Sequence, residues 1–426
     1  MVLRREILFL AWIILLPSLL HAQLSISAQV RPRAEYRDGF KTPANTLDEA
    51  AYFVEQRSRL SFDWVDSTYE VRISFQDVRI WGESPQIVKQ EDGNTFLNEA
   101  WILYKATPAL KLKIGRQAIS YDNQRILGAL EWAQQARRHD AILAILSNQK
   151  RSFDLHLGAA FNQDDEIAEP AFIQSPTAGF YAVPGNYKFM QFAWFHHQHE
   201  KTPFSLVALN TTWQNQDTTT SSRYTLGGNL AFQLTSELRL VADAYYQGGK
   251  LGSRKLNAYL AGIRVSWVPS STHTLGVEQI SGSKADLSSS DAFTHFLPDF
   301  GTNHAHNGFM DYFFVGPSNG TVGVTDVFLK NTIPLKRGSL KIHLHHFLTA
   351  SDQTDSNGQS LKDHLANEVD LVYQLSLKKG VQFHLGYSFL RATDSMLKLR
   401  NRNRKDNHWA WMMISVSPNI KISRKG

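Results

Sequence analysis

The sequence predicts an all-β protein, a single transmembrane antiparallel β-barrel of about 18 strands with long extracellular loops. Three observations support this fold class. The chain opens with a segment typical of export, and apolar and polar residues alternate along most of the remainder. After residue 22, no stretch approaches the 18 or so apolar residues of a transmembrane helix. An exported chain with this pattern is either a large soluble β-protein or a barrel that crosses a membrane with strands.

Residues 1–22 have the three parts of a secretory signal peptide. Arg4 and Arg5 supply positive charge, residues 7–20 are almost wholly apolar, and Ala22 is the small residue before the expected cleavage site. The apolar run is too short for a membrane anchor, which needs about 20 residues. The sequence contains no cysteine, which excludes a lipoprotein anchor, disulfides and Cys-ligated metal sites.

We expect residues 23–426 to form one domain, the barrel, because strand-like alternation begins at its start and continues to its end. In residues 223–234, for example, apolar side chains occupy one face and mostly polar ones the other, as a wall between lipid and water requires. The predicted strands are 24–36, 52–64, 69–79, 97–106, 109–117, 139–147, 151–162, 187–197, 203–213, 223–235, 237–247, 257–268, 272–281, 321–330, 339–350, 366–378, 380–392 and 407–417.

A soluble β-sandwich also alternates, and two features weigh against it. The predicted strands follow one another as hairpins without a break into domains, through tight joints such as Thr107-Pro108 and Lys379-Gly380. Many strands carry charges on one face and large aliphatic residues on the other, which suits lipid outside and water inside. Aromatic residues near strand ends fit the two interfacial girdles of a barrel; they are Tyr36, Trp64, Trp81, Trp101, Trp267, Trp409 and Trp411.

The polar faces predict a lumen with a slight positive excess and one local concentration of arginine. Five arginines lie on the first three predicted strands, which are neighbours in a barrel: Arg31, Arg33, Arg57, Arg59 and Arg72. Guanidinium groups bind carboxylates through paired hydrogen bonds, so this arginine track favours anionic solutes. Elsewhere, we expect inward acids and bases to pair with one another. The net charge of +6 is too small and too evenly spread to indicate nucleic-acid binding.

Two long stretches without a strand pattern, 163–186 and 282–320, are candidates for loops that constrict a pore. The first carries Asp164, Asp165, Glu166 and Glu169. The second carries His304, His306 and Asp311, which we take as constriction residues. With Asp299 they could bind a metal, but their spacing is loose, and a folded loop with hydrogen-bonded histidines is the preferred interpretation.

The sequence singles out no catalytic residues, metal ligands or cofactor. It contains no Gly-x-Ser-x-Gly, no glycine-rich phosphate loop and no His-Glu-x-x-His. Serine, histidine and aspartate are abundant, but no pattern selects three of them. We therefore expect a protein that is not an enzyme.

Residues 114–141 resemble a conserved run in the alginate export family of outer-membrane barrels. Gly115-Arg116-Gln117 ends a predicted strand, a segment with Arg125, Gly128 and Trp132 follows, and Asp140-Ala141 opens the next strand. The stretches Gly301-Thr-Asn-His304 and Gly308-Phe-Met-Asp311-Tyr312 also look like the family's sequences. The resemblance extends over essentially the whole chain in length and strand count, because the family's characterised exporter is an 18-stranded monomeric barrel.

In that exporter, an arginine-rich constriction guides a polyanionic uronic-acid chain outward. The resemblance implies that Arg116 and Arg125 line the pore here, with Arg138 and Asp140 nearby. Strict alternation puts Arg116 on the same face as Leu112 and Ile114, so its predicted role requires a bulge or a position at the membrane interface. Fold does not dictate cargo, so the transported solute need not be alginate.

The sequence thus leads to one principal hypothesis and two alternatives. The principal hypothesis is a Gram-negative outer-membrane channel for an anionic polysaccharide or a small anionic solute. The alternatives are a barrel-embedded hydrolase and a plugged structural or adhesive barrel. Expected partners are outer-membrane lipid, the barrel-assembly machinery and the anionic solute; we expect a monomer and no nucleic acid.

Overall fold

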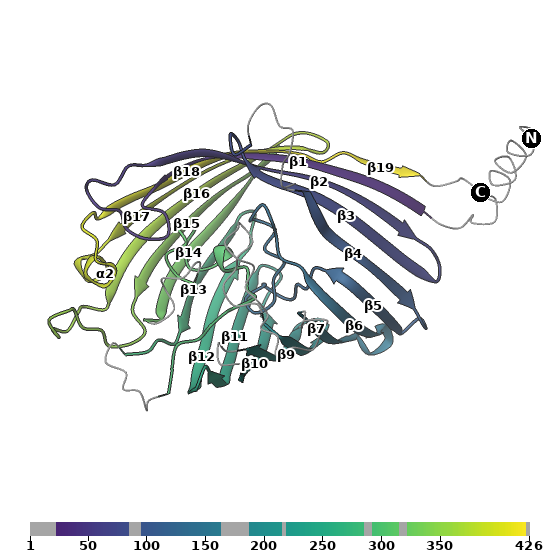
Figure 1. Cartoon of the computed structure of the whole chain (residues 1–426), viewed down its shortest axis with the longest axis horizontal. Helices are drawn as coiled ribbons and strands as arrows, with labels where there is room; N and C mark the ends of the chain where they lie inside the picture. The colour runs from purple at the N-terminus through teal and green to yellow at the C-terminus, as the bar shows by residue number, and fades with distance from the viewer. Residues whose placement is uncertain are drawn as a thin grey trace, which may run out of the picture.

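The computed structural model describes residues 23–84, 95–162, 187–214, 219–284, 292–314 and 322–422. In this part of the chain, 19 strands form one antiparallel sheet that curls into a barrel (Figure 1). The expected signal peptide, the acidic stretch 163–186 with Asp164, Asp165, Glu166 and Glu169, and parts of the stretch 282–320 lie outside the described residues.

The strands agree with the 18 predicted segments to within a few residues at each end. They are β1 (Gln23–Asp38), β2 (Ala51–Val65), β3 (Tyr69–Ile80), β4 (Thr95–Lys105), β5 (Leu110–Gln117), β6 (His139–Asn148), β7 (Phe153–Phe161), β8 (Phe189–His197), β9 (Phe204–Gln214), β10 (Thr220–Gln233), β11 (Leu238–Leu251), β12 (Arg254–Trp267), β13 (Thr272–Ile280), β14 (Val324–Leu335), β15 (Gly338–Leu348), β16 (His364–Lys378), β17 (Val381–Ala392), β18 (Asp406–Val416) and β19 (Asn419–Ile422).

The barrel closes where the first strand meets the last. β1 pairs with β2 on one side and with both β18 and β19 on the other, and one continuous register runs through both partners from Asp38↔His408 to Leu24↔Ile422. β19 therefore continues β18 beyond the break at Ser417-Pro418. If β18 and β19 are taken as one strand, the described wall has 18 strands. The predicted closed barrel of about 18 strands is confirmed.

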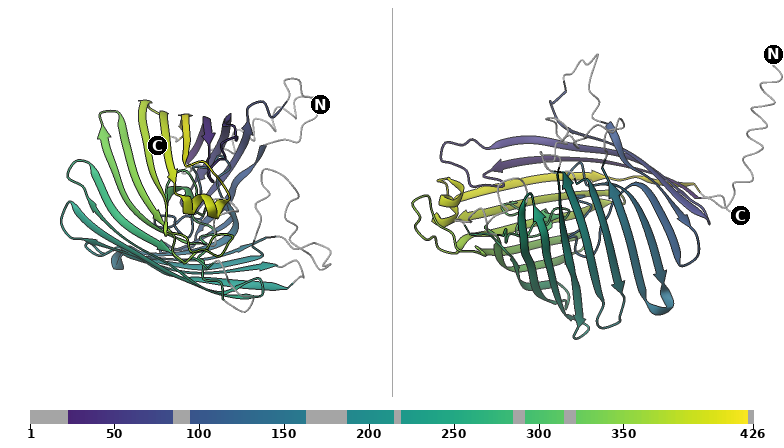
Figure 2. Two further views of the ribbon diagram at one scale, coloured as in Figure 1. Left: turned by 90° about the vertical axis from the view of Figure 1, so that its left-hand side faces the viewer. Right: turned by 60° about the horizontal axis from the view of Figure 1, so that its bottom comes forward.

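The connections differ between the two ends of the barrel. At one end, consecutive strands are joined by turns of two to six residues, and β1 begins and β19 finishes there. The other end carries the long loops and the short helix α2 (Asp394–Arg400), which the alternation did not predict (Figure 2). Outer-membrane barrels place their short turns in the periplasm and their long loops outside, which sets the orientation of this one.

The distribution of side chains is the inverse of that in a soluble protein. Apolar residues in mid-strand are exposed on the outer face, including Leu60, Ile102, Leu226 and Leu385. Charged side chains facing inward are buried: Arg57 is 2% exposed and Asp370 is 1% exposed. Such a surface is stable only if the outer face contacts hydrocarbon. No helix in the described part of the chain is long and apolar enough to cross a membrane.

The prediction of interfacial aromatics is correct for part of the set and wrong for three tryptophans. Tyr36, Trp64, Trp81 and Trp267 lie on the outer face near strand ends, where Tyr36 packs against Tyr52 at 4.9 Å between ring centroids. Trp101, Trp409 and Trp411 instead point inward: Trp409 is 1% exposed, and its indole N–H donates to Glu35 at 2.8 Å. Closeness to a strand end does not decide the face; the odd or even position along the strand does.

Candidate pore and its constriction

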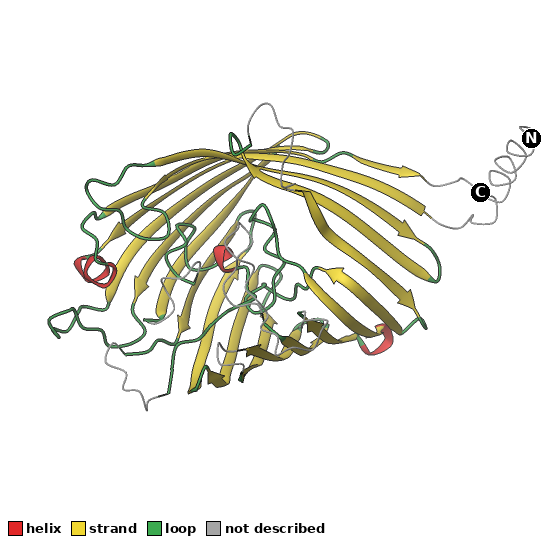
Figure 3. Ribbon diagram, viewed as in Figure 1, coloured by secondary structure: helices red, strands yellow, loops and turns green. Residues whose placement is uncertain are grey.

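Two loops from the long-loop end fold into the lumen and pack against each other (Figure 3). One joins β5 to β6 (residues 118–138), and the other consists of residues 292–314 of the connection before β14. Gly128 N donates to Phe300 O at 2.8 Å, and Thr302 N donates to Gln124 O at 2.9 Å. These backbone bonds join the loops into one inserted unit, hereafter the plug.

An aromatic cluster attaches the plug to the wall. The Trp132 ring stacks on His304 with centroids 4.8 Å apart and packs edge-on against Trp411 at 4.7 Å. The Arg33 guanidinium lies over the same indole, 4.4 Å from its centroid. The inward tryptophans of β18 therefore anchor a loop inside the barrel.

The arginine track predicted on the first three strands exists, and the structure extends it by one residue. Arg31, Arg33, Arg57 and Arg59 face the lumen from β1 and β2, and Arg72 faces it from β3. Arg138, at the end of the first plug loop, joins them with a side chain that is 4% exposed. We keep the name arginine track for these six residues.

Glu131 of the plug lies at the centre of the arginine track. Its carboxylate is 3.0 Å from Arg57, 3.2 Å from Arg59 and 2.5 Å from Arg138, and its backbone carbonyl accepts a bond from Arg31 at 2.9 Å. Enclosure in the lumen raises the pKa of Glu131, but the guanidinium groups of Arg59, Arg138 and Arg57 outweigh this effect and lower the pKa to about 2. Glu131 is therefore an anion bound by arginines that the protein itself supplies.

A cavity of about 310 Å³ adjoins this cluster. Its lining includes Arg57, Arg59, Arg72 and Glu131 together with residues 417–419 at the junction of β18 and β19. Because that junction lies toward the short-turn end, the cavity is on the periplasmic side of the plug. Solute from the periplasm would meet the arginine track there.

Arg125 lies in the lumen, as expected, but on the plug rather than on the wall. It is 1% exposed and donates to Glu278 of β13 at 2.5 Å and to Asn307 of the second plug loop at 2.6 Å. Its Nε and Nη1 atoms are buried without a hydrogen-bond partner in the structure. Arg125 therefore connects the two plug loops to the wall.

The histidines expected at the constriction are inside the plug, where each has a local partner. His304 Nδ1 and Asp311 Oδ1 are 2.7 Å apart, and His306 Nε2 donates to the carbonyl of Asn123 at 3.2 Å. Burial lowers the pKa of His306 well below its usual value, and nearby Arg125 lowers it further. Asp299 is paired with Arg223 instead. The structure thus does not assemble these residues into the metal site considered as an alternative.

Arg116 and Asp140 do not face the lumen, so the expectation that they line the pore is wrong. They pair at 2.9 Å and share the outer face of β5 and β6 with Ile114 and Ile142, which are 45% and 50% exposed. Gly115 precedes this pair with φ +118°, and a Cβ there would lie 2.2 Å from the carbonyl oxygen of Ala100. The alternation of β5 continues through this glycine, so Arg116 remains on the face that simple counting gives it.

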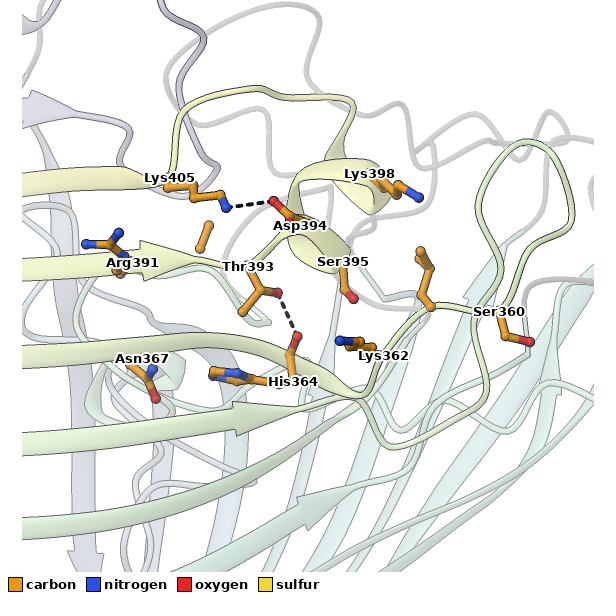
Figure 4. A pocket seen from close by; sticks show the side chains of 12 residues that line it. Ser360, Lys362, His364, Asn367, Arg391, Thr393, Asp394, Ser395, Lys398 and Lys405 are labelled. Carbon is orange, nitrogen blue, oxygen red and sulfur yellow. Dashed lines mark hydrogen bonds and ion pairs between the residues drawn. The ribbon is translucent and has the colours of Figure 1, made fainter.

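A cavity near the long-loop end, shown in Figure 4, lies outside the channel. It has a volume of about 550 Å³ and is lined by Asn367 and Arg391 together with Lys398, Lys405 and neighbouring residues. Asn367 and Arg391 pair across β16 and β17 and share the outer face with Val369 and Phe389. Lys405 is paired with Asp394 at 2.8 Å. This cavity is therefore a groove on the outer rim and does not belong to the pore.

Sequence reasoning missed the residues that organise the arginine track. Trp132 was identified only as part of a motif, and neither Glu131 nor Glu99, which lies 3.4 Å from Arg72, received a role. A signal was present: Glu131 is one of only two acids in residues 118–138, and it adjoins an aromatic residue in a predicted loop. The sequence could not show that this loop turns inward.

Solved structures similar to this one are outer-membrane barrels. OpdK of Pseudomonas aeruginosa matches with a TM-score of 0.60 and 13% identity, over 93% of this chain and 99% of its own. OccK9 (OpdG) of the same species matches with a TM-score of 0.62 and 13% identity, over 93% and 98%. OccAB4 of Acinetobacter baumannii matches with a TM-score of 0.60 and 10% identity, over 93% and 98%. At these identities, the likeness shows the fold.

Sequence comparison gives the family. No curated protein matches this sequence. The sequence model named alginate export matches residues 22–410, nearly the whole chain and all of the arginine track. Together with the closed barrel, this match places the protein in the outer membrane of a Gram-negative bacterium as a channel for solutes. The chain belongs to the alginate export family.

Proposed function

We propose that this channel passes anionic solutes, either an anionic polysaccharide of the alginate type or small organic anions, along the arginine track. The observation that carries the proposal is the carboxylate of Glu131 bound by Arg57, Arg59 and Arg138 in the lumen. A carboxylate of a uronic acid offers these guanidinium groups the same two oxygens. The family's name supports a polysaccharide, and one crystal structure of OpdK contains vanillate, an aromatic carboxylate.

The partners of the arginines support passage by exchange rather than permanent binding. Arg33 is held by wall residues: its guanidinium is 2.7 Å from Glu35, whose side chain is fully buried. Arg57 and Arg59 are instead neutralised by Glu131, which comes from a loop and whose side chain is 45% exposed. An incoming carboxylate could replace Glu131 without breaking a pair inside the wall. Exchange of equivalent partners keeps each step nearly balanced in energy, which favours conduction over trapping.

Planar-bilayer recording tests the proposal. The purified protein should conduct, its reversal potential in asymmetric KCl should show anion preference, and uronic-acid oligomers should reduce the current. Replacing Arg57 and Arg59 together by Glu should weaken or reverse the preference, since it places two negative charges on the lumen wall. Arg116→Glu is the matched control because Arg116 lies on the outer face.

Three outcomes would contradict the proposal in different ways. A silent protein would favour the plugged structural or adhesive barrel. A conducting protein whose reversal potential ignores the double substitution would remove the arginine track from selectivity. If Arg116→Glu shifted the potential as much as the double variant, the assignment of inner and outer faces would be wrong.

We further propose that residues 1–22 are removed on export and that the barrel-assembly machinery inserts the remainder as a monomer. In support, the first strand begins at Gln23, directly after the expected cleavage site. The N-terminal sequence of protein purified from outer membranes would test the cleavage. Native mass spectrometry in detergent would test the monomeric state.

A further inference from the structure

A second group of titratable side chains, made of histidines and acids, lies in the lumen wall on β14, β15 and β16. His343 and His345 face inward from β15, and His343 stands directly opposite Asp370 of β16. One ligand atom from each of these three residues lies within 4.8 Å of the other two. All three residues are buried, with Asp370 only 1% exposed.

The facing atoms of this group have no hydrogen-bond partners. His343 Nδ1 and His345 Nε2 are buried and unpaired, and Asp370 Oδ2 is buried, accepts from no donor group and belongs to a carboxyl that faces that of Glu368. His345 Nε2 is 3.9 Å from Asp370 Oδ2. Buried polar atoms are rarely left unpaired, because each costs about 1–3 kcal/mol. Three that converge on one point indicate a shared partner at that point.

The outer contacts of these side chains match those of metal ligands. His345 Nδ1 is 2.9 Å from both carboxylate oxygens of Asp326, which leaves Nε2 free to bind as a neutral imidazole. Asp370 Oδ1 accepts from Ser388 Oγ at 2.5 Å, which leaves Oδ2 free. A carboxylate behind a histidine is the common second layer of protein metal sites, where it fixes the ring and raises its basicity.

The charge of the group also calls for a cation. Asp326, Glu368 and Asp370 are each 1% exposed, and the carboxyl groups of Glu368 and Asp370 face each other on β16. The ammonium group of Lys330, on β14 opposite His343, interacts electrostatically with Asp326 and Asp370 and offsets part of their charge. A divalent ion would offset the remaining negative charge where water does not reach.

We propose that His343, His345 and Asp370 bind a divalent transition-metal ion of the Zn²⁺ type, with Asp326 orienting His345. Two imidazoles and one carboxylate are a ligand set that suits Zn²⁺. Metal–ligand bonds of about 2.0–2.2 Å require the three atoms to approach to about 3.3 Å, so small side-chain rotations would complete the site. A cavity of about 220 Å³, whose lining includes Asp326, Phe328 and Lys330 but none of the three ligands, lies on the Asp326 side of the site.

The site would also secure the plug. The second plug loop covers it: Phe309 packs on His343 at 5.2 Å, Met310 N donates to Glu368 at 2.8 Å, and Asn307 donates to Asp326 at 3.3 Å. Gly308 has φ +81°, and a Cβ there would lie 2.4 Å from Glu368, so only glycine lets the loop approach this closely. Metal binding would thus hold the wall that the loop packs against.

Metal titration of the full, tag-free protein in detergent tests the proposal. After treatment with EDTA, we expect one equivalent of Co²⁺ to give the visible absorption of a site with nitrogen and oxygen ligands, and Zn²⁺ to displace it. His345→Ala and Asp370→Asn should weaken binding at least 100-fold. Asp326→Asn, which alters the outer contact alone, should weaken it about 10–100-fold.

His346→Ala is the matched control, because His346 follows on the same strand but points outward, where it contacts Asn367 at 2.7 Å. This variant should bind the metal as the unaltered protein does. Heat-modifiable gel mobility would establish that each variant is folded. The proposal fails if the unaltered protein takes up no Co²⁺ or Zn²⁺, or if His346→Ala loses binding while His345→Ala retains it. Both readouts are independent of conductance, so the channel proposal could fail and leave this one standing.

Discussion

Glu131→Gln is the most direct perturbation of the arginine track, because it removes one charge while keeping the shape of the side chain. Its carboxylate lies within 3.2 Å of three guanidinium groups. An anion that reaches these groups comes within about 4 Å of the carboxylate, where two like charges repel by about 1 kcal/mol in water. Since 1.4 kcal/mol is a factor of ten, removing the charge should raise anion occupancy about fivefold. Salt at 0.1 M, with a Debye length of about 10 Å, reduces this to about threefold.

The assay is the reversal potential of single channels in asymmetric KCl. Glu131→Gln should shift it toward the chloride potential, by an amount that corresponds to an anion-to-cation permeability ratio about threefold higher. Glu200→Gln is the control, because Glu200 is exposed in the turn between β8 and β9. An unchanged potential in Glu131→Gln would refute the reasoning, as would an equal shift in both variants. Either result would mean that permeating ions do not pass this carboxylate.

Three further outcomes follow from the same geometry. Leu226→Arg should lower the free energy of unfolding by about 2–4 kcal/mol in lipid vesicles titrated with urea, whereas Asn229→Arg should be tolerated because it faces the lumen; equal losses would contradict the lipid assignment. The difference in reversal potential between Glu131→Gln and the unaltered channel should stay constant from pH 8 to about 4. The pKa of Glu131 is lowered to about 2, so its charge and its stabilising effect are fully present above the unfolded value of about 4.3 and are lost only as pH falls toward 2; a midpoint near 4.3 would contradict this. Arg125→Ala should destabilise the fold by about 3–5 kcal/mol, because it leaves buried Glu278 without its cation. It should also increase the noise of the single-channel current. A variant with unchanged stability and noise would show that Arg125 does not hold the plug.

The wall of the barrel was predictable from sequence because its period is local. Alternation in residues 223–234 places Leu226 outward and Asn229 inward, as the structure has them. The same rule places Arg116 outward, and it is correct there against the implication of the family resemblance. The three inward tryptophans were assigned from their nearness to strand ends, which carries no information about the face.

The candidate site was predictable only where it lies on consecutive strands. Arg31, Arg57 and Arg72 come together because neighbouring strands pair, so their clustering could be read from the sequence. The position of Glu131 depends on a loop that folds inward, and no local pattern encodes that direction. The cluster of His343, His345 and Asp370 depends on the register of β15 against β16, which sets His343 opposite Asp370. Register over a long barrel is determined by all its strand pairs together.

Two of the attachments of the plug differ in kind, and this difference bears on how an anion could pass without unfolding of the plug. Toward β13 to β16, the plug is held by buried contacts such as that of Arg125 with Glu278. Removal of one partner there would leave a buried charge without a counter-charge. Toward β1 to β3, Glu131 is bound at a partly exposed carboxylate, where an incoming anion can replace it. On the proposed path, an anion therefore weakens only the contact of the Glu131 carboxylate. Arg31 still holds the backbone carbonyls of Glu131, Trp132 and Ala133, so the loop keeps its place while the Glu131 side chain turns away. When the anion leaves, the carboxylate can return to the free guanidinium groups of Arg57 and Arg59, so that the channel opens and closes through one side chain.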